Sequence, residues 1–174
     1  MKYDINNKHI FLYFEEYFDE IKYKPENILS LQICLCNKIN NIPNNLINLK
    51  YLFLQDNQNI KTIPNLYKLE NLYIENCKNI EKLPNNLPNL KKLVLINTNI
   101  KEIPNTYINL KILKIKNSFN INFISNNFIN LEKLILINNN QNIIIPNSFK
   151  NLKYLETDIY KIYDYLNIKK LIIL

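Results

Sequence analysis

Apolar residues recur along this chain at intervals of 20 or 21 positions. Each copy of the pattern opens with a Leu or Ile, and further apolar residues follow three and five positions later, except that Thr157 takes the second of these places in the last copy. The opening residues are Ile28, Leu49, Leu69, Leu90, Leu110, Leu131 and Leu152. Because apolar positions alternate with other residues after each opening, every copy predicts a short strand that buries one face.

The second half of each copy predicts a return segment that leads to the next strand. Most copies place an Ile-Pro or Leu-Pro pair there, such as Ile42 with Pro43, whereas the fifth copy has Ile124 with Ser125. The period is too short for a long crossover helix, and the fixed φ of proline suits an extended or 3₁₀ backbone. One copy alone cannot fold, because its few buried side chains contribute about 1.5–3 kcal/mol each while ordering costs about 1–2 kcal/mol per residue. Stacked copies would share one core and pair their strands into a parallel sheet.

This pattern resembles the leucine-rich repeat, L-x-x-L-x-L-x-x-N/C-x-L, which Leu90, Leu93 and Leu95 match directly. The resemblance covers residues 28–160 as seven repeats. It implies an α/β solenoid, a right-handed horseshoe with a parallel β-sheet on its concave face and an extended or 3₁₀ convex side.

The ninth position of each copy carries a second feature of the family. In leucine-rich repeats, an Asn or another small polar residue at this place points inward and hydrogen-bonds backbone groups where the chain leaves the strand. The residues found there are Cys36, Asn57, Cys77, Thr98, Ser118, Asn139 and Tyr160. Because Tyr160 departs from the rule, we expect the regular repeats to end near it.

Both terminal segments depart from the repeat, as the exposed ends of a stacked core require. In residues 8–22, aromatic and apolar residues fall on one helical face, at Phe11, Phe14, Phe18 and Ile21. We therefore expect residues 1–27 to form an N-terminal helical cap, with a docking helix for a partner as the alternative. In residues 161–174, Ile168, Leu171 and Ile173 are spaced like one more strand, which predicts a C-terminal capping repeat.

The composition is strongly biased and excludes several classes of protein. The chain has no Gly, Ala, Arg or Trp, and its abundant Asn, Ile and Lys all have AT-rich codons. This bias resembles that of leucine-rich-repeat families in AT-rich genomes, including those of insect poxviruses. Without glycine there can be no Walker loop, no dinucleotide fingerprint and no nucleophile elbow, because each needs backbone conformations that glycine supplies.

Candidate catalytic and metal-binding residues are few. His9 is the only histidine and lies outside the repeats, so the usual zinc and Ser-His-Asp arrangements are missing. Cys36 and Cys77 fall at the inward ninth position, whereas Cys34 is expected on the concave face as a free thiol. We therefore expect no enzymatic activity, no catalytic residue, no metal and no cofactor.

The third, fifth and seventh positions of each copy should point away from the core, onto the concave face. The candidate partner-binding residues on it are Tyr51, Phe53, Tyr73, Lys92, Val94, Ile96, Ile112, Lys114, Lys116, Lys133, Ile135 and Ile137. Tyr and Phe supply contact area at a low rotamer cost, and lysines favour a partner with acidic character. The alternative is a neutral surface on which biased codon usage has placed Ile, Lys and Tyr.

The sequence therefore predicts a non-catalytic protein–protein interaction module, such as an adaptor, that binds a partner through its concave face and is a monomer when free. A second hypothesis is a regulatory or structural subunit that docks through its terminal caps. A third is a basic binder of nucleic acid or of a membrane surface, since the net charge is +7. Against the third, the lysines are scattered and arginine, the residue preferred for phosphate, is absent. The odd number of cysteines and the lack of a secretory or membrane segment favour an intracellular, cytoplasmic protein.

Overall fold

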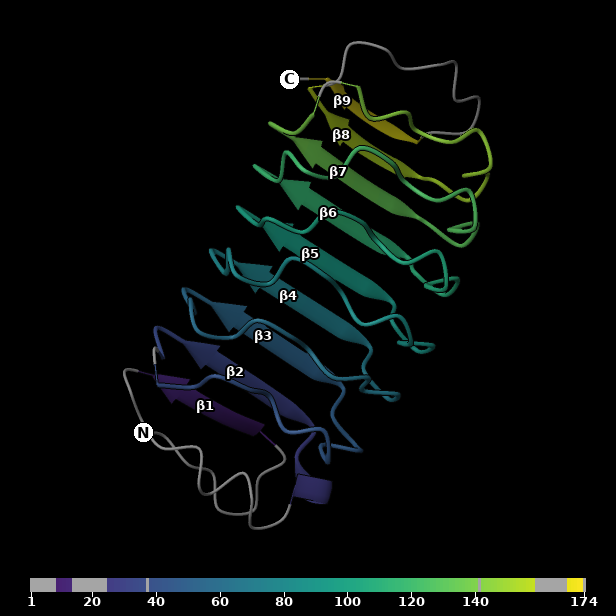
Figure 1. Ribbon diagram of the computed structural model, residues 1–174. Helices are drawn as coiled ribbons and strands as arrows, with labels where there is room; N and C mark the ends of the chain where they lie inside the picture. The colour runs from purple at the N-terminus through teal and green to yellow at the C-terminus, as the bar shows by residue number, and fades with distance from the viewer. Residues whose placement is uncertain (1–8, 14–24, 37, 141, 159–168, 174) are drawn as a thin grey trace.

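In the computed structural model, residues 9–13, 25–36, 38–140, 142–158 and 169–173 are described. They form a solenoid with one sheet of nine parallel strands, which lie side by side in sequence order (Figure 1). The elements are β1 (His9–Tyr13), the 3₁₀ helix η2 (Pro25–Asn27), β2 (Ser30–Cys34), β3 (Tyr51–Gln55), β4 (Asn71–Glu75), β5 (Lys92–Ile96), β6 (Ile112–Lys116), β7 (Lys133–Ile137), β8 (Tyr154–Thr157) and β9 (Lys170–Ile173). The return segments between the repeat strands are turns and irregular backbone. This architecture confirms the predicted parallel solenoid.

One continuous hydrophobic core runs between the sheet and the return segments. Each strand pairs with the strand of the next repeat at equivalent positions, so that Leu52 lies beside Leu72 and Leu54 lies beside Ile74. Side chains at these positions are buried along the whole sheet from β2 to β7, and the return segments add their own apolar residues to the same cluster. Because each repeat is covered by its neighbours, the core is complete only when the repeats are stacked.

The ninth-position side chains satisfy buried backbone groups, as the family resemblance implies. Asn57 is fully buried; its Oδ1 accepts a hydrogen bond from the Cys36 N–H at 3.0 Å, and its Nδ2 donates to the Ile33 carbonyl at 2.7 Å. Asn139 repeats this arrangement with the Ser118 N–H at 3.0 Å and the Ile115 carbonyl at 2.8 Å. The prediction is thereby confirmed at these positions, whereas Tyr160 lies outside the described residues.

The eighth position shows how a chain without glycine turns sharply after each strand. Its residues have left-handed backbone: Leu35 (φ 57°), Asp56 (54°), Asn76 (54°), Asn97 (51°), Asn117 (53°) and Asn138 (51°). In this conformation the Asp56 N–H donates to the Glu75 carbonyl at 3.0 Å, and the Asn76 N–H donates to the Ile96 carbonyl at 3.0 Å. Asn and Asp tolerate left-handed backbone better than other non-glycine residues, so these side chains replace glycine here.

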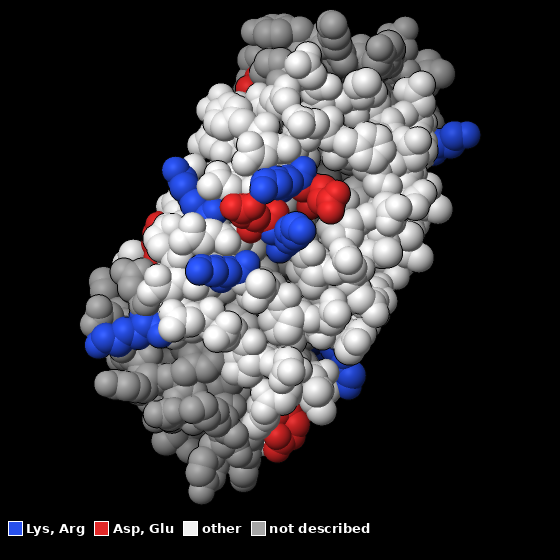
Figure 2. Space-filling view, in the orientation of Figure 1, with Lys and Arg blue, Asp and Glu red and all other residues white. Residues whose placement is uncertain are grey.

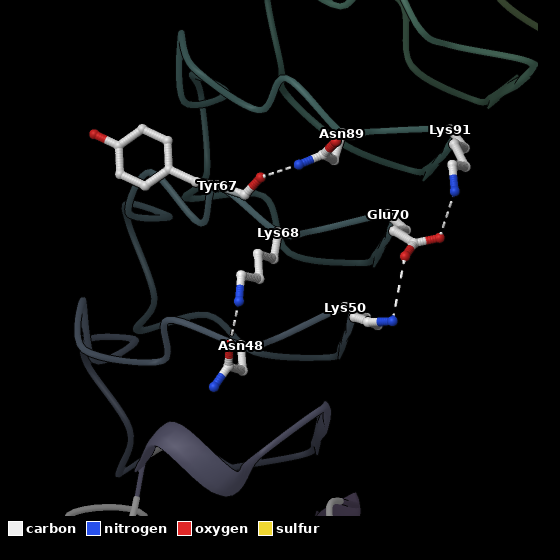
Figure 3. A network of polar contacts seen from close by, with 7 residues as sticks. All are labelled: Asn48, Lys50, Tyr67, Lys68, Glu70, Asn89 and Lys91. Atoms are coloured by element: carbon white, nitrogen blue, oxygen red, sulfur yellow. Dashed lines mark hydrogen bonds and ion pairs between the residues drawn. The ribbon is translucent and has the colours of Figure 1, made fainter.

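A row of asparagines also connects the return segments of successive repeats. These residues precede the first Leu of a repeat, and the side-chain amide of each donates to a carbonyl of the previous repeat. The bonds are Asn89 to Tyr67 at 2.7 Å, Asn109 to Pro88 at 2.8 Å, Asn130 to Ile108 at 2.9 Å and Asn151 to Ile129 at 2.9 Å. The third repeat has Lys68 in this place, and its ammonium donates to Asn48 Oδ1 at 2.6 Å instead (Figure 3). Part of the high asparagine content is therefore structural.

The prediction of an N-terminal helix is wrong for residues 9–13. These residues form β1, which pairs with β2 so that Ile10 lies beside Leu31 and Leu12 beside Ile33. The physical reason is that Ile10 and Leu12 continue the two-residue alternation of the sheet, and the free edge of β2 offers backbone hydrogen bonds to a segment of β-prone residues. The rest of the predicted helix, residues 14–22, lies outside the described residues.

At the other end of the sheet, the predicted additional strand is present. β9 pairs with β8, which places Leu171 beside Leu155 and Ile173 beside Thr157. Leu155 and Thr157 are fully buried, whereas Leu171 and Ile173 of β9 are 48% and 55% exposed. Within the described ranges, the chain forms no helix of the length and hydrophobicity needed to cross a membrane.

Candidate functional site

The parallel register arranges the outward side chains of the strands in three rows across the sheet. The row through the fifth positions runs from Gln32 through Phe53, Tyr73, Val94, Lys114 and Ile135 to Glu156. The rows of third and seventh positions run alongside it, and neighbouring strands lie about 4.8 Å apart. Every candidate partner-binding residue therefore lies on one face of β3 to β7, which we call the concave face.

Aromatic side chains dominate the part of the concave face over β3 and β4. The rings of Phe53 and Tyr73 stack with centroids 4.3 Å apart and planes inclined by 15°. Tyr51 is 46% exposed beside them. A hollow of about 270 Å³ lies here, and Val94 and Lys92 of β5 form its far wall. Stacked, partly exposed rings beside a hollow are a suitable receptor for an apolar side chain.

Two carboxylates on this side of the sheet, Glu75 of β4 and Glu156 of β8, accept hydrogen bonds from tyrosine hydroxyls. The Tyr73 hydroxyl donates to Glu75 Oε2 at 2.7 Å, and burial together with this bond raises the pKa of Tyr73 to about 12. On β8, the Tyr154 hydroxyl donates to Glu156 Oε2 at 2.8 Å, which raises the pKa of Tyr154. Both tyrosines are therefore neutral donors at physiological pH, and both carboxylates are held in place.

Lysines and aliphatic residues make up the part of the concave face over β5, β6 and β7. Lys114 lies beside Val94 and Ile135, and Lys116 lies beside Ile96 and Ile137. In the third-position row, Ile112 lies between the lysines of β5 and β7, Lys92 and Lys133. The Lys133 ammonium lies 4.1 Å from the centre of the Tyr154 ring, a cation–π contact. This part of the face therefore combines positive charge with apolar contact area.

Three side chains expected on the concave face are more buried than the sequence suggests. Val94 is 4% exposed and Ile135 is 8% exposed, because each is short and lies between longer side chains in the fifth-position row. Cys34 is likewise 4% exposed. Cys34 forms no disulfide, as expected, but its thiol is buried. Val94 and Ile135 support the surface more than they present contact area.

Ionic rows along the start of the strands were not anticipated from the sequence. Glu70 lies between Lys50 and Lys91, with N–O distances of 3.6 and 2.8 Å (Figure 3). Glu132 lies in the same way between Lys111 and Lys153, at 3.4 and 2.8 Å. The hydrogen bond from Lys91 lowers the pKa of Glu70, and that from Lys153 lowers the pKa of Glu132. The signal was present in the sequence, as charges of opposite sign one repeat apart.

Charges of both signs are also mixed on the face shown in Figure 2, where they gather near the middle and most of the surrounding surface is uncharged. Over the part of the chain that the structure describes, no group of three or more His, Cys, Asp and Glu side chains is placed to hold a metal ion. Burial raises the pKa of Cys77 to about 11, so its thiol is protonated at neutral pH. The aromatic cluster and the hollow beside it make the concave face the candidate site.

Comparison with protein-family models finds no match, and comparison with curated proteins finds none either. Among solved structures, the chain is similar to a leucine-rich-repeat protein of Leptospira interrogans, with a TM-score of 0.59 and 25% sequence identity. The alignment covers 74% of this chain and 36% of the Leptospira chain, so this chain spans little more than a third of that protein's length. The repeated sequence pattern, the parallel solenoid and this structural likeness identify the chain as a leucine-rich-repeat protein.

Proposed function

We propose that this protein is a non-catalytic interaction module that binds a protein partner through the concave face of β3 to β7. The observation that carries the proposal is the aromatic cluster, in which Phe53 and Tyr73 stack beside the exposed Tyr51 and the hollow next to them. Exposed aromatic area on a rigid sheet is costly for an isolated protein and useful for binding, because little side-chain entropy is lost when a partner docks.

Capture of a partner from an extract of the source organism tests this proposal. We would compare the unmodified chain with a Tyr51→Ser, Phe53→Ser variant of the concave face. The control is Tyr67→Ser, Ile108→Ser, because these two residues are exposed at least as much as Tyr51 but lie on return segments. All three proteins are compared by circular dichroism, and the extract is treated with nuclease.

The proposal predicts a protein that the unmodified chain and the control retain and that the concave variant loses at least tenfold. Equal retention by all three folded proteins would contradict it, and would favour the neutral surface that biased codon usage alone can produce.

A second candidate function is that of a regulatory or structural subunit docked through the end of the solenoid. The half-exposed Leu171 and Ile173 of β9 favour it, because the equivalent side chains of the inner strands are fully buried. In the same capture experiment, a Leu171→Ser, Ile173→Ser variant would lose the partner in place of the concave variant.

A further inference from the structure

We propose that the partner presents an extended acidic segment, whose carboxylates pair with Lys92, Lys114 and Lys116 while an apolar side chain of the same segment fills the hollow beside Phe53 and Tyr73. This inference rests on the proposed function and deepens it, since it states which polypeptide chemistry the concave face recognises and how that segment runs.

The first observation is a contrast between two sets of lysines. Along the start of the strands, Lys50, Lys91, Lys111 and Lys153 all have a glutamate within 3.6 Å. On the concave face, the ammonium groups of Lys92, Lys114 and Lys116 form no ion pair and donate no side-chain hydrogen bond among the residues described. Like charges gathered on adjacent strands repel one another, and carboxylates from a partner would remove that repulsion and speed the encounter.

The second observation is that this positive area is bounded on both sides. Glu75 on β4 and Glu156 on β8 lie on the same face as the lysines of β5 to β7. A nucleic acid or another long polyanion that ran across the sheet would meet both carboxylates. A short acidic stretch would not, because it can end within the three lysine-bearing strands.

The third observation is the apolar surface between the lysines. Ile96, Ile112 and Ile137 are partly exposed and alternate with Lys92, Lys114, Lys116 and Lys133 in the strand register. Such a surface fits a polypeptide in which acidic residues alternate with apolar ones better than it fits a phosphate backbone. The chain also has no arginine, the residue best suited to binding phosphate with two hydrogen bonds.

Strand spacing gives the expected separation between the apolar anchor and the acidic residues. Tyr73 on β4 and Lys114 on β6 are two strands apart, which corresponds to roughly 10 Å at about 4.8 Å per strand. An extended segment advances about 3.3 Å per residue. The acidic residues are therefore expected about three positions from the apolar anchor, in a segment that crosses the strands.

Selection from a random displayed peptide library against the immobilised full chain provides the probe. The proposal predicts enriched peptides with a large apolar residue about three positions from two or more acidic residues. A Lys114→Glu, Lys116→Glu variant of the protein should bind a synthetic copy of an enriched peptide at least tenfold more weakly than the unmodified chain does. A peptide in which each Glu is replaced by Gln should bind the unmodified chain with a similar loss of affinity.

A charge-matched control separates local pairing from net charge. Lys61→Glu, Lys78→Glu changes the formal charge equally, at exposed lysines outside the strands. If this control loses as much affinity for the peptide as the Lys114→Glu, Lys116→Glu variant does, the inference is overturned. It is also overturned if a single-stranded oligonucleotide binds the chain and depends on Lys114 and Lys116 as strongly as the peptide does. Enriched peptides that lack acidic residues, but whose binding is lost in a Tyr51→Ser variant, would overturn the inference and leave the proposed function intact. If no selected peptide depends on Tyr51 or on the concave lysines, both are contradicted.

Discussion

At the scale of single residues, the turn after each strand depends on side chains that tolerate left-handed backbone. Asp or Asn occupies five successive eighth positions with φ between 51° and 54°, whereas Leu35 occupies the first one described with φ 57°. Leucine has no short polar group to stabilise this conformation, and its side chain is 42% exposed, so little burial offsets the strain.

Replacement of Leu35 by Asn is therefore expected to stabilise the fold by about 1 kcal/mol, because the left-handed conformation costs leucine about that much more. The reverse change, Asn76→Leu, should destabilise it by at least as much, since it also removes the bond from Asn76 Nδ2 to Asp56 Oδ1. Urea unfolding midpoints measure both. A lower midpoint for Leu35→Asn would show that the Leu35 backbone is not strained.

The buried Asn57 supports a second prediction at this scale. Asn57→Ala leaves the Cys36 N–H and the Ile33 carbonyl without their side-chain partner in the core. The expected loss of unfolding free energy is about 2–4 kcal/mol, because each unsatisfied buried group costs about 1–3 kcal/mol. Asn41→Ala is the control, since Asn41 is exposed and should change the unfolding free energy by less than about 0.5 kcal/mol. Equal effects of the two substitutions would contradict this role.

At the scale of elements, the sequence predicted the strands of the repeats and failed at the first one. The alternation after Leu49 or Leu90 is unambiguous because a full repeat surrounds it. In residues 9–13 the same alternation competes with a helical spacing of aromatic residues, and the available edge of β2 favours the strand.

The rows of side chains on the concave face could be predicted from the repeat. The burial of Val94 and Ile135 could not, since it depends on the lengths of the neighbouring side chains across the sheet. The left-handed turns were missed although Asp or Asn recurs directly after each strand from β3 to β7.

The ionic rows connect neighbouring elements and lead to a pH prediction. Because the pKa values of Glu70 and Glu132 are lowered below 4.5 in the folded state, the unfolded chain binds protons first as the pH falls. The stability from these pairs is present above pH 4.5 and is lost as the pH falls through the lowered values. A Glu70→Gln, Glu132→Gln variant should therefore show a shallower loss of stability in acid than the unmodified chain, in urea unfolding between neutral pH and pH 3. Identical slopes would show that the pairs do not contribute.

At the scale of the whole molecule, the rows of side chains on the concave face are continuous because each strand packs against the strands of the neighbouring repeats. A side chain on that face is placed by the strand beneath it and by the same position one repeat away. The aromatic cluster over β3 and β4 and the lysines over β5 to β7 are therefore held at fixed separations before any partner arrives. Preorganisation of this kind lowers the entropic cost of binding.

Site-specific photo-crosslinking tests the concave-face account most directly. A photoreactive benzoylphenylalanine would replace Tyr51 in one protein and Tyr67 in another, since both tyrosines are well exposed but only Tyr51 lies on the concave face. After irradiation in extract, the account predicts a discrete protein adduct from position 51 that is absent from position 67. An adduct from position 67 alone, or the same adducts from both positions, would contradict it.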